Sequence, residues 1–118
     1  MAKKHEVIIV GMGLASLAAA ARLNELGVKD IGIYTTAYGG TPYIAAINFV
    51  LPDNPYGDTI GQYNDDMIHA GYGINNKTLV QDMAASTMEG YKLLRRWGVE
   101  FAKNEDGTTK LRHLSGHT

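Results

Sequence analysis

The sequence contains no cysteine among its 118 residues. This absence excludes disulfides, cysteine-ligated zinc sites, thiolate-held iron–sulfur clusters and a cysteine nucleophile from the chain. A basic excess is also missing, because 11 Lys and Arg residues stand against 12 Asp and Glu residues and give a net charge of −1. Nucleic-acid binding requires a basic surface that neutralises phosphates, so we expect no nucleic-acid partner.

The apolar run near the start of the chain is too short to cross a membrane, which takes about 20 apolar residues. Gly11 and Gly13 interrupt the run, and His5 and Glu6 precede only four apolar residues, unlike a secretory signal. We therefore expect no direct membrane insertion. Together with the lack of cysteine, this favours a cytoplasmic location.

The first third of the chain has the pattern of a strand–helix–strand unit. Glu6–Val10 is apolar and β-branched, as in a buried parallel strand. Leu14–Leu26 has helical apolar spacing and ends before Gly27, and Asp30–Tyr34 reads as a second buried strand. The length of about 30 residues is usual for a βαβ motif.

The remainder predicts two helices and a β-hairpin. We expect one helix over Thr59–Ala70 with Asp58 as its cap, and a longer helix over Lys77–Trp97 capped by Asn75 or Asn76. The hairpin is expected because two short segments flank a tight turn. Its strands would be Val99–Ala102 and Thr109–Leu114, and its turn would be Asn104–Gly107. No repeat or linker divides the chain, so residues 1–118 are predicted to be one portion of a domain without an internal boundary.

A glycine-rich turn joins the first strand to the first helix. Gly11 and Gly13 match the first two glycines of the dinucleotide-binding fingerprint G-x-G-x-x-G, and Ser16 takes the third position. Such a turn lets backbone N–H groups at a helix N-terminus approach a pyrophosphate. The same glycines also occur in ordinary tight strand–helix turns, so the motif predicts a bound dinucleotide without identifying it.

The second strand ends without the acidic residue that binds ribose hydroxyls in simple NAD-binding units. Thr35 and Thr36 stand there instead. Their hydroxyls can hydrogen-bond a ribose, although with less specificity than a carboxylate. No arginine stands beside them, which disfavours a 2′-phosphate.

Three further segments occur in a recognisable order. They read YGGTPYIAAINFVL, NDDMIHAGYGINNKTLVQDMAASTMEGYKLLRRWGVEF and NEDGTTKLRHLSGHT. With the glycine turn they resemble the N-terminal part of the flavoprotein family that contains L-aspartate oxidase and the flavoprotein subunits of succinate dehydrogenase and fumarate reductase. The resemblance covers essentially the whole chain. It implies an α/β fold in which a Rossmann-like FAD-binding βαβ unit precedes helices and a β-hairpin.

The resemblance also implies positions for an FAD. The pyrophosphate would lie against Gly11, Gly13, Ala15 and Ser16; the adenosine ribose near Thr35 and Thr36; the phosphate-side loop would be Gly39, Gly40 and Thr41; and the flavin-side turn would include Ala45, Ala46 and Asn48.

Two departures from the family pattern concern the flavin. The family's Gln-Gly-Gly turn is replaced by Ile44, Ala45 and Ala46, which removes a glutamine amide and adds two methyl groups. Some members attach FAD through a histidine just before this turn, but residues 37–41 read AYGGT. The FAD is therefore expected to be bound non-covalently.

Complete members of this family are several times longer than 118 residues. A two-stranded parallel sheet with one covering helix cannot bury both of its faces. We therefore expect a second polypeptide to complete the sheet and to carry the catalytic residues of an FAD-dependent oxidoreductase that acts on a (di)carboxylate-like small molecule. The alternatives are a truncated fragment, a non-catalytic interaction subunit that kept the nucleotide-binding fold, and a stand-alone NAD-binding Rossmann module.

Overall fold

A computed structural model describes residues 3–40, 43 and 46–112 of the 118-residue chain. The chain divides into two compact units, Met1–Ile47 and Asn48–Thr118, which are described separately. The expectation that residues 1–118 form the N-terminal portion of a single FAD-binding domain stays a prediction.

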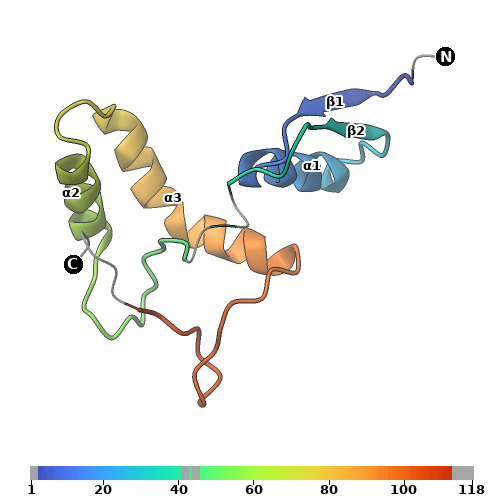
Figure 1. Cartoon of the computed structure of the whole chain (residues 1–118). Helices are drawn as coiled ribbons and strands as arrows, with labels where there is room; N and C mark the ends of the chain where they lie inside the picture. The colour runs from blue at the N-terminus through green and yellow to red at the C-terminus, as the bar shows by residue number, and fades with distance from the viewer. Residues whose placement is uncertain (1–2, 41–42, 44–45, 113–118) are drawn as a thin grey trace. The chain divides into compact units, whose positions relative to one another are not determined.

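The first unit is a strand–helix–strand motif (Figure 1). It contains β1 (Val7–Val10), α1 (Leu14–Glu25) and β2 (Ile31–Tyr34). The two strands pair in parallel, with Val7 opposite Ile31 and Val10 opposite Tyr34. The predicted order of elements is therefore confirmed, with each boundary within one residue of the expected one.

The sheet of the first unit has one covered face and one open face. Val7 and Ile9 are half-buried on the side of β1 against which α1 packs, whereas Ile8 and Val10 are 55% and 83% exposed. The exposed face agrees with the expectation that a two-stranded sheet with one covering helix cannot bury both of its faces. Within the part of the chain that the structure describes, α1 packs against β1.

A small polar cluster covers part of the sheet beside the open face. The His5 Nδ1 atom lies 2.8 Å from Asp30 Oδ1, and His5 Nε2 lies 3.1 Å from the Tyr34 hydroxyl. The ring rests against buried Gly32, where an added Cβ would approach the His5 ring to 2.5 Å. Gly32 thus makes room for a histidine that links the start of β2 to its end.

The second unit contains the helices α2 (Ile60–Ala70) and α3 (Lys77–Arg96), which pack against each other (Figure 1). Its core includes Val50, Tyr63 and Ala84, with Met67 packed against them. The helical spacing predicted for α3 is confirmed, because one face of the helix is buried; the buried residues are Val80, Ala84, Thr87, Tyr91 and Leu94.

The caps of these helices agree only in part with the sequence-based prediction. Asn76 caps α3, as expected, and its Oδ1 accepts from the N–H of Leu79 at 3.2 Å. Asp58 does not cap α2, because Thr59 occupies that position and its Oγ1 accepts from Gln62 N–H at 3.1 Å. The Asp58 carboxylate instead accepts from the backbone of Thr59 at 3.1 Å.

The predicted hairpin strands do not form within the described residues. A turn is present, but a single antiparallel bridge, Lys103 to Thr109, closes it. The reason lies partly in α3, because the N–H of Val99 donates to the carbonyl of Leu94 at 3.0 Å and is used in ending the helix. Residues 113–118, which include the predicted end of the second strand, lie outside the described part.

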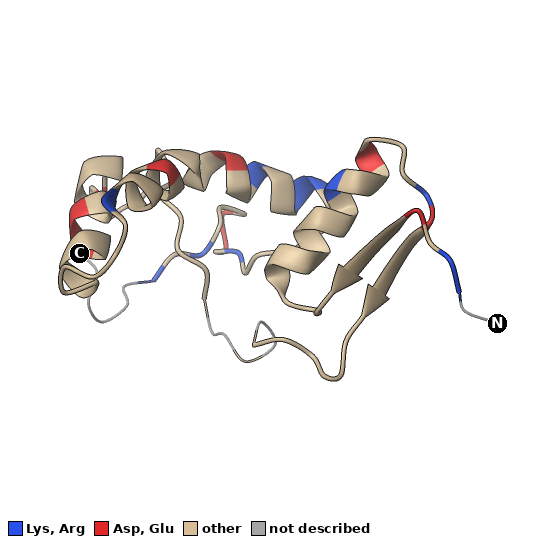
Figure 2. Ribbon diagram, turned by 90° about the horizontal axis from the view of Figure 1, so that it is seen from above, with Lys and Arg blue, Asp and Glu red and all other residues tan. Residues whose placement is uncertain are grey.

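Lysines and arginines stand on several elements, with acidic residues among them (Figure 2). This mixture agrees with the net charge of −1. Within residues 3–40, 43 and 46–112, no helix combines the length and the apolar character that a membrane crossing needs.

We predict that Asn76→Ala destabilises the second unit by about 1 kcal/mol, because α3 loses the acceptor for its first-turn N–H groups. Asn76→Asp keeps an acceptor at this position and is expected to retain the wild-type stability. Denaturant unfolding followed by circular dichroism measures both variants. An unchanged midpoint for Asn76→Ala would show that the cap contributes nothing.

We also predict an acid-sensitive contact in the first unit. The hydrogen bond from His5 holds the pKa of Asp30 below its ordinary value of 3.8, so folding favours the ionised carboxylate. The resulting stability is present above the ordinary pKa and is lost as the pH falls through the lowered one. Thermal unfolding between about pH 5 and pH 2 should show this loss. His5→Phe, which still covers Gly32 but donates no hydrogen bond, should show a smaller pH dependence.

Candidate functional site

The candidate site lies where β1 and β2 end and α1 begins. The backbone N–H of Gly11 donates to the carbonyl of Tyr34 at 2.8 Å, which ties the glycine turn to the end of β2. Gly11 has φ +104°, a backbone conformation that L-residues with side chains rarely adopt. The turn that the G-x-G pattern predicts is therefore present, and it directs the chain into α1.

The N-terminus of α1 is open to an incoming ligand. Gly13 is its N-cap residue and provides no side-chain hydrogen bond, and no acidic residue stands in the first turn. A Cβ placed on Gly13 would have no atom of the described residues within 4 Å. Backbone N–H groups and the positive end of the helix dipole favour an anion at such a position. The geometry and the residue types therefore fit a phosphate group.

Ser16 and Ala15 occupy the first turn of α1. Ser16 is half-buried, and its Oγ lies 3.6 Å from the place that a Cβ on Gly11 would take. Its side chain is therefore accommodated beneath the turn where the fingerprint usually has glycine. Ala15 is exposed.

The loop after β2 packs directly on the glycine turn. The N–H of Gly39 donates to the carbonyl of Met12 at 3.2 Å, and a Cβ on Gly39 would lie only 2.7 Å from the Cα of Gly13. Glycine is therefore needed at position 39 for this close approach. Gly40 follows, with its carbonyl accepting from Tyr43 N–H at 2.9 Å. The structure thus brings Gly11, Gly13 and Gly39 together, and their contacts with FAD stay a prediction.

The two threonines that follow β2 differ in their availability. Thr35 Oγ1 donates to the carbonyl of Ala37 and accepts from Ala37 N–H at 3.3 Å, which forms a local side-chain turn. Its proton is therefore engaged, and an oxygen lone pair is what remains for a ribose hydroxyl. Thr36 is exposed beside it.

The flavin-side residues cannot be assembled into one site. Thr41 and Ala45, with Ile44, lie outside the described residues. Ala46 is exposed in the first unit, and Asn48 is a half-buried residue of the second unit. Their proposed contacts with FAD stay predictions, as do those of the residues on the phosphate and ribose sides.

Sequence reasoning missed the backbone contributions to this site. Met12 supplies the carbonyl that anchors Gly39, and Ala37 supplies both partners of Thr35. Backbone atoms are common to all residues, so neither position carries a distinctive residue type. The available signal was the glycine at position 39, whose missing side chain permits the close contact.

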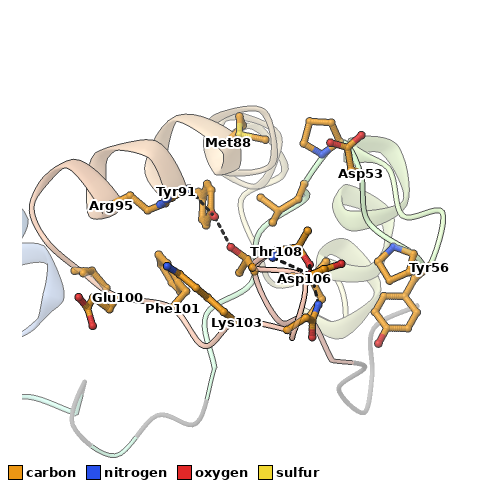
Figure 3. Close-up of a pocket in the computed structure, with 18 of the residues that line it drawn as sticks. Asp53, Tyr56, Met88, Tyr91, Arg95, Glu100, Phe101, Lys103, Asp106 and Thr108 are labelled. Atoms are coloured by element: carbon orange, nitrogen blue, oxygen red, sulfur yellow. Dashed lines mark hydrogen bonds between the residues drawn. The ribbon is translucent and has the colours of Figure 1, made fainter.

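The second unit contains a cavity of about 1070 Å³ between the segment after Val50, the C-terminal half of α3 and the turn that follows (Figure 3). The Tyr91 hydroxyl is hydrogen-bonded to Thr109 Oγ1 at 2.5 Å, and the Arg95 guanidinium carbon lies 5.7 Å from the Tyr91 ring centre. Hydrogen bonds from Thr108 lower the pKa of Asp106. Several of its polar side chains are thus paired with one another, and none of the predicted cofactor residues lines it.

Metal binding has no support in the described ranges, where no three His, Asp or Glu side chains gather as ligands. The adjacent carboxylates Asp65 and Asp66 do not form such a group. The candidate site is therefore the glycine turn with the N-terminus of α1.

Comparison with known proteins extends this assignment. The family described as FAD binding domain matches residues 6–118. The acrylate reductase flavoprotein subunit of Shewanella woodyi is 30% identical over 98% of this chain and 23% of its own length. The L-aspartate oxidase of Pyrococcus furiosus is 31% identical over 85% of this chain and 21% of its own length. That of Pyrococcus abyssi is 37% identical over the same shares.

The fold also resembles that of a solved structure. The structure described as Mycobacterium smegmatis Sdh1 in complex with UQ1 superimposes with a TM-score of 0.79 over 97% of this chain and 20% of the other. The sequence identity is 22%, so this likeness shows the fold alone.

This chain spans about a fifth of the length of the curated relatives that it matches. The predicted cofactor, FAD, is confirmed by the family match and by the flavoprotein relatives. From the match over residues 6–118, together with a glycine turn and helix N-terminus that fit a phosphate, the chain belongs to the FAD binding domain family of flavoprotein oxidoreductases.

Proposed function

We propose that this chain is the FAD-binding part of a split flavoprotein oxidoreductase of the fumarate reductase, succinate dehydrogenase and L-aspartate oxidase type. A second polypeptide completes the fold and carries the catalytic residues, and the assembly is cytoplasmic. The observation that carries the proposal is the start of α1, where the N-cap Gly13 provides no side-chain hydrogen bond and has open space at its Cβ position, in a chain that spans about a fifth of the length of its flavoprotein relatives.

In this proposal each end of the site has a separate task. Backbone N–H groups after Gly11 and Gly13 bind the pyrophosphate, because the helix N-terminus favours negative charge. The loop with Gly39, Gly40 and Thr41 lies beside the phosphates. Thr35 and Thr36 accept hydrogen bonds from the ribose.

The flavin ring lies near Ala45, Ala46 and Asn48. In the absence of a histidine in residues 37–41, FAD is held without a covalent bond. When bound, FAD supplies hydride transfer at N5 of its ring. This chain binds and orients the cofactor, while binding of a (di)carboxylate-like substrate and proton transfer belong to the second polypeptide.

The open face of the sheet supports the need for further structure. Parallel sheets in α/β proteins are normally covered on both faces. Ile8 and Val10 on β1 are 55% and 83% exposed, and Tyr34 at the end of β2 is 45% exposed. Additional elements from a second polypeptide would remove this apolar surface from water and stabilise the cofactor site beside it.

A non-catalytic interaction subunit is the second candidate. The engaged hydroxyl of Thr35 and the presence of Ser16 in place of the third glycine favour it, because both weaken cofactor binding relative to the usual pattern. The open space above Gly13 and the close contact at Gly39 favour retained binding. A direct measurement of bound FAD separates the two.

We predict that the complex isolated under native conditions contains this chain of 12.8 kDa, a second polypeptide and one FAD. Native mass spectrometry measures the three masses together, and denaturation should release FAD because no covalent bond holds it. A complex without FAD would support the interaction subunit. This chain alone, without cofactor, would refute the split flavoprotein.

We further predict that Gly13→Ala lowers the affinity for FAD by about tenfold or more, because the methyl group occupies the space of the phosphate and removes a charge-assisted contact. Within residues 3–40, 43 and 46–112, no atom lies within 4 Å of the new Cβ, so this part of the fold can accept it.

The matched control is Gly61→Ala in the first turn of α2. Its Cβ makes ordinary contact at 3.7 Å with Thr59 Oγ1, and it lies outside the candidate site. This variant should keep full FAD content in a flavin absorbance titration. Equal affinities for wild type and Gly13→Ala would contradict phosphate binding at α1.

A further inference from the structure

Four large apolar side chains are exposed in the turn between α2 and α3 and in the first two turns of α3. The turn joins the two helices in Figure 1. Tyr72 and Ile74 in the turn are 91% and 93% exposed, and Leu79 and Met83 on α3 are 65% and 44% exposed. Leu79 and Met83 are four residues apart and therefore lie on one side of the helix. We name these four residues the hairpin-end patch.

The turn that carries the patch is held by polar contacts. Asn75 Nδ2 donates to the carbonyl of Met67 at 2.8 Å, and the N–H of Ile74 donates to the carbonyl of Gly71 at 3.0 Å. Asn75 is packed so tightly that a Cβ on Gly71 would lie 2.3 Å from its Nδ2. The turn geometry is therefore fixed without burying Tyr72 or Ile74.

Tyr72 has an unfavourable backbone conformation. Its φ of +48° is the single positive value among the non-glycine residues that the structure describes. Glycine or asparagine adopts this conformation at lower cost than tyrosine. A side chain that is 91% exposed gains little packing within the chain to offset that cost. The conformation ends α2, where the N–H of Tyr72 donates to the carbonyl of His69 at 3.0 Å, and the exposed side chain is left available for a contact outside the chain.

We propose that the hairpin-end patch docks onto the second polypeptide of the flavoprotein. The inference rests on the proposed function. About four fifths of the length of the relatives has no counterpart in this chain, whereas 97% of this chain matches the solved fold, α2 and α3 included. The part of the relatives that this chain does not span is therefore large enough to cover a surface on each unit.

The chemistry of the patch suits a protein partner. Tyrosine and large apolar residues held in a rigid turn are typical anchors of protein interfaces, because little side-chain entropy is lost on binding. The exposed charged residues of the two helices include both signs, with Asp65 on α2 and Lys77 and Asp82 on α3. This mixture differs from the basic clusters that bind an anionic lipid surface.

The patch and the FAD site belong to different units. The glycine turn lies in the first unit, and the patch lies in the second. Loss of the patch should therefore weaken assembly while leaving the local geometry of the glycine turn intact. This separation lets an experiment distinguish failure of docking from failure of FAD binding.

The test uses the complex of this chain with its second polypeptide, isolated under native conditions. Native mass spectrometry over a dilution series gives the concentration at which the complex dissociates. Tyr72→Ser/Ile74→Ser is expected to raise this concentration on the order of 100-fold, because each anchor contributes about tenfold or more. At concentrations where it is assembled, the variant should retain one FAD and the wild-type far-ultraviolet circular dichroism. Val99→Ser, an apolar-to-serine change just after α3, is the matched control and should dissociate as the wild type does.

Tyr72→Gly is a second variant, chosen so that weaker binding cannot be attributed to a strained backbone at this position. Glycine relieves the strain at φ +48°, so a purely structural role of Tyr72 predicts an equally stable or more stable complex, whereas docking predicts a weaker one.

Unchanged dissociation of both the double variant and Tyr72→Gly would overturn the docking surface while the split flavoprotein stands. Loss of self-association instead of partner binding would show that a second copy of this chain occupies the patch. Flotation of the chain with vesicles of phosphatidylcholine and phosphatidylserine, lost in the double variant, would assign the patch to lipid. A wild-type chain that carries neither FAD nor a second polypeptide would refute the proposed function and this inference with it.

Discussion

The contact between the glycine turn and the loop after β2 is the constraint on which the candidate site depends. Gly11 accepts a left-handed backbone and donates to the end of β2, while Gly39 approaches the Cα of Gly13 more closely than any side chain permits. Among the described residues, these contacts leave open space at the Cβ position of Gly13, the N-cap of α1. The same small residues therefore bring the segments together and provide room for a phosphate.

Each unit of the chain combines an ordered interior with exposed apolar surface. In the first unit, α1 packs on one face of the sheet and Ile8 and Val10 remain exposed on the other. In the second, Tyr63 and Ala84 form a core between α2 and α3, while Tyr72 and Ile74 project into solvent. Burial of such surface is the main favourable term in folding and association. The proposed second polypeptide would remove this apolar surface from water on both units.

Local patterns predicted the elements well where one short-range interaction decides the outcome. The apolar strands, the helical stripe of α3 and the Asn76 cap each depend on neighbouring residues, and the structure agrees with them. At the α2 cap and in the hairpin, the outcome depended on which of several nearby groups formed a particular hydrogen bond. Thr59 displaced Asp58 as the cap, and the end of α3 used the N–H of Val99 that a strand would have needed.

The sequence by itself determined the βαβ motif, the glycine turn and the family, because these depend on residue type and spacing along the chain. The tertiary structure decided that Gly39 rests on Gly13, that the Thr35 proton is engaged by Ala37, and that Tyr72 is exposed in a left-handed conformation. Contacts between backbone atoms of distant residues carry no signature in residue type. Exposure likewise depends on which elements pack together, and a linear pattern of apolar residues cannot specify which of its faces stays uncovered.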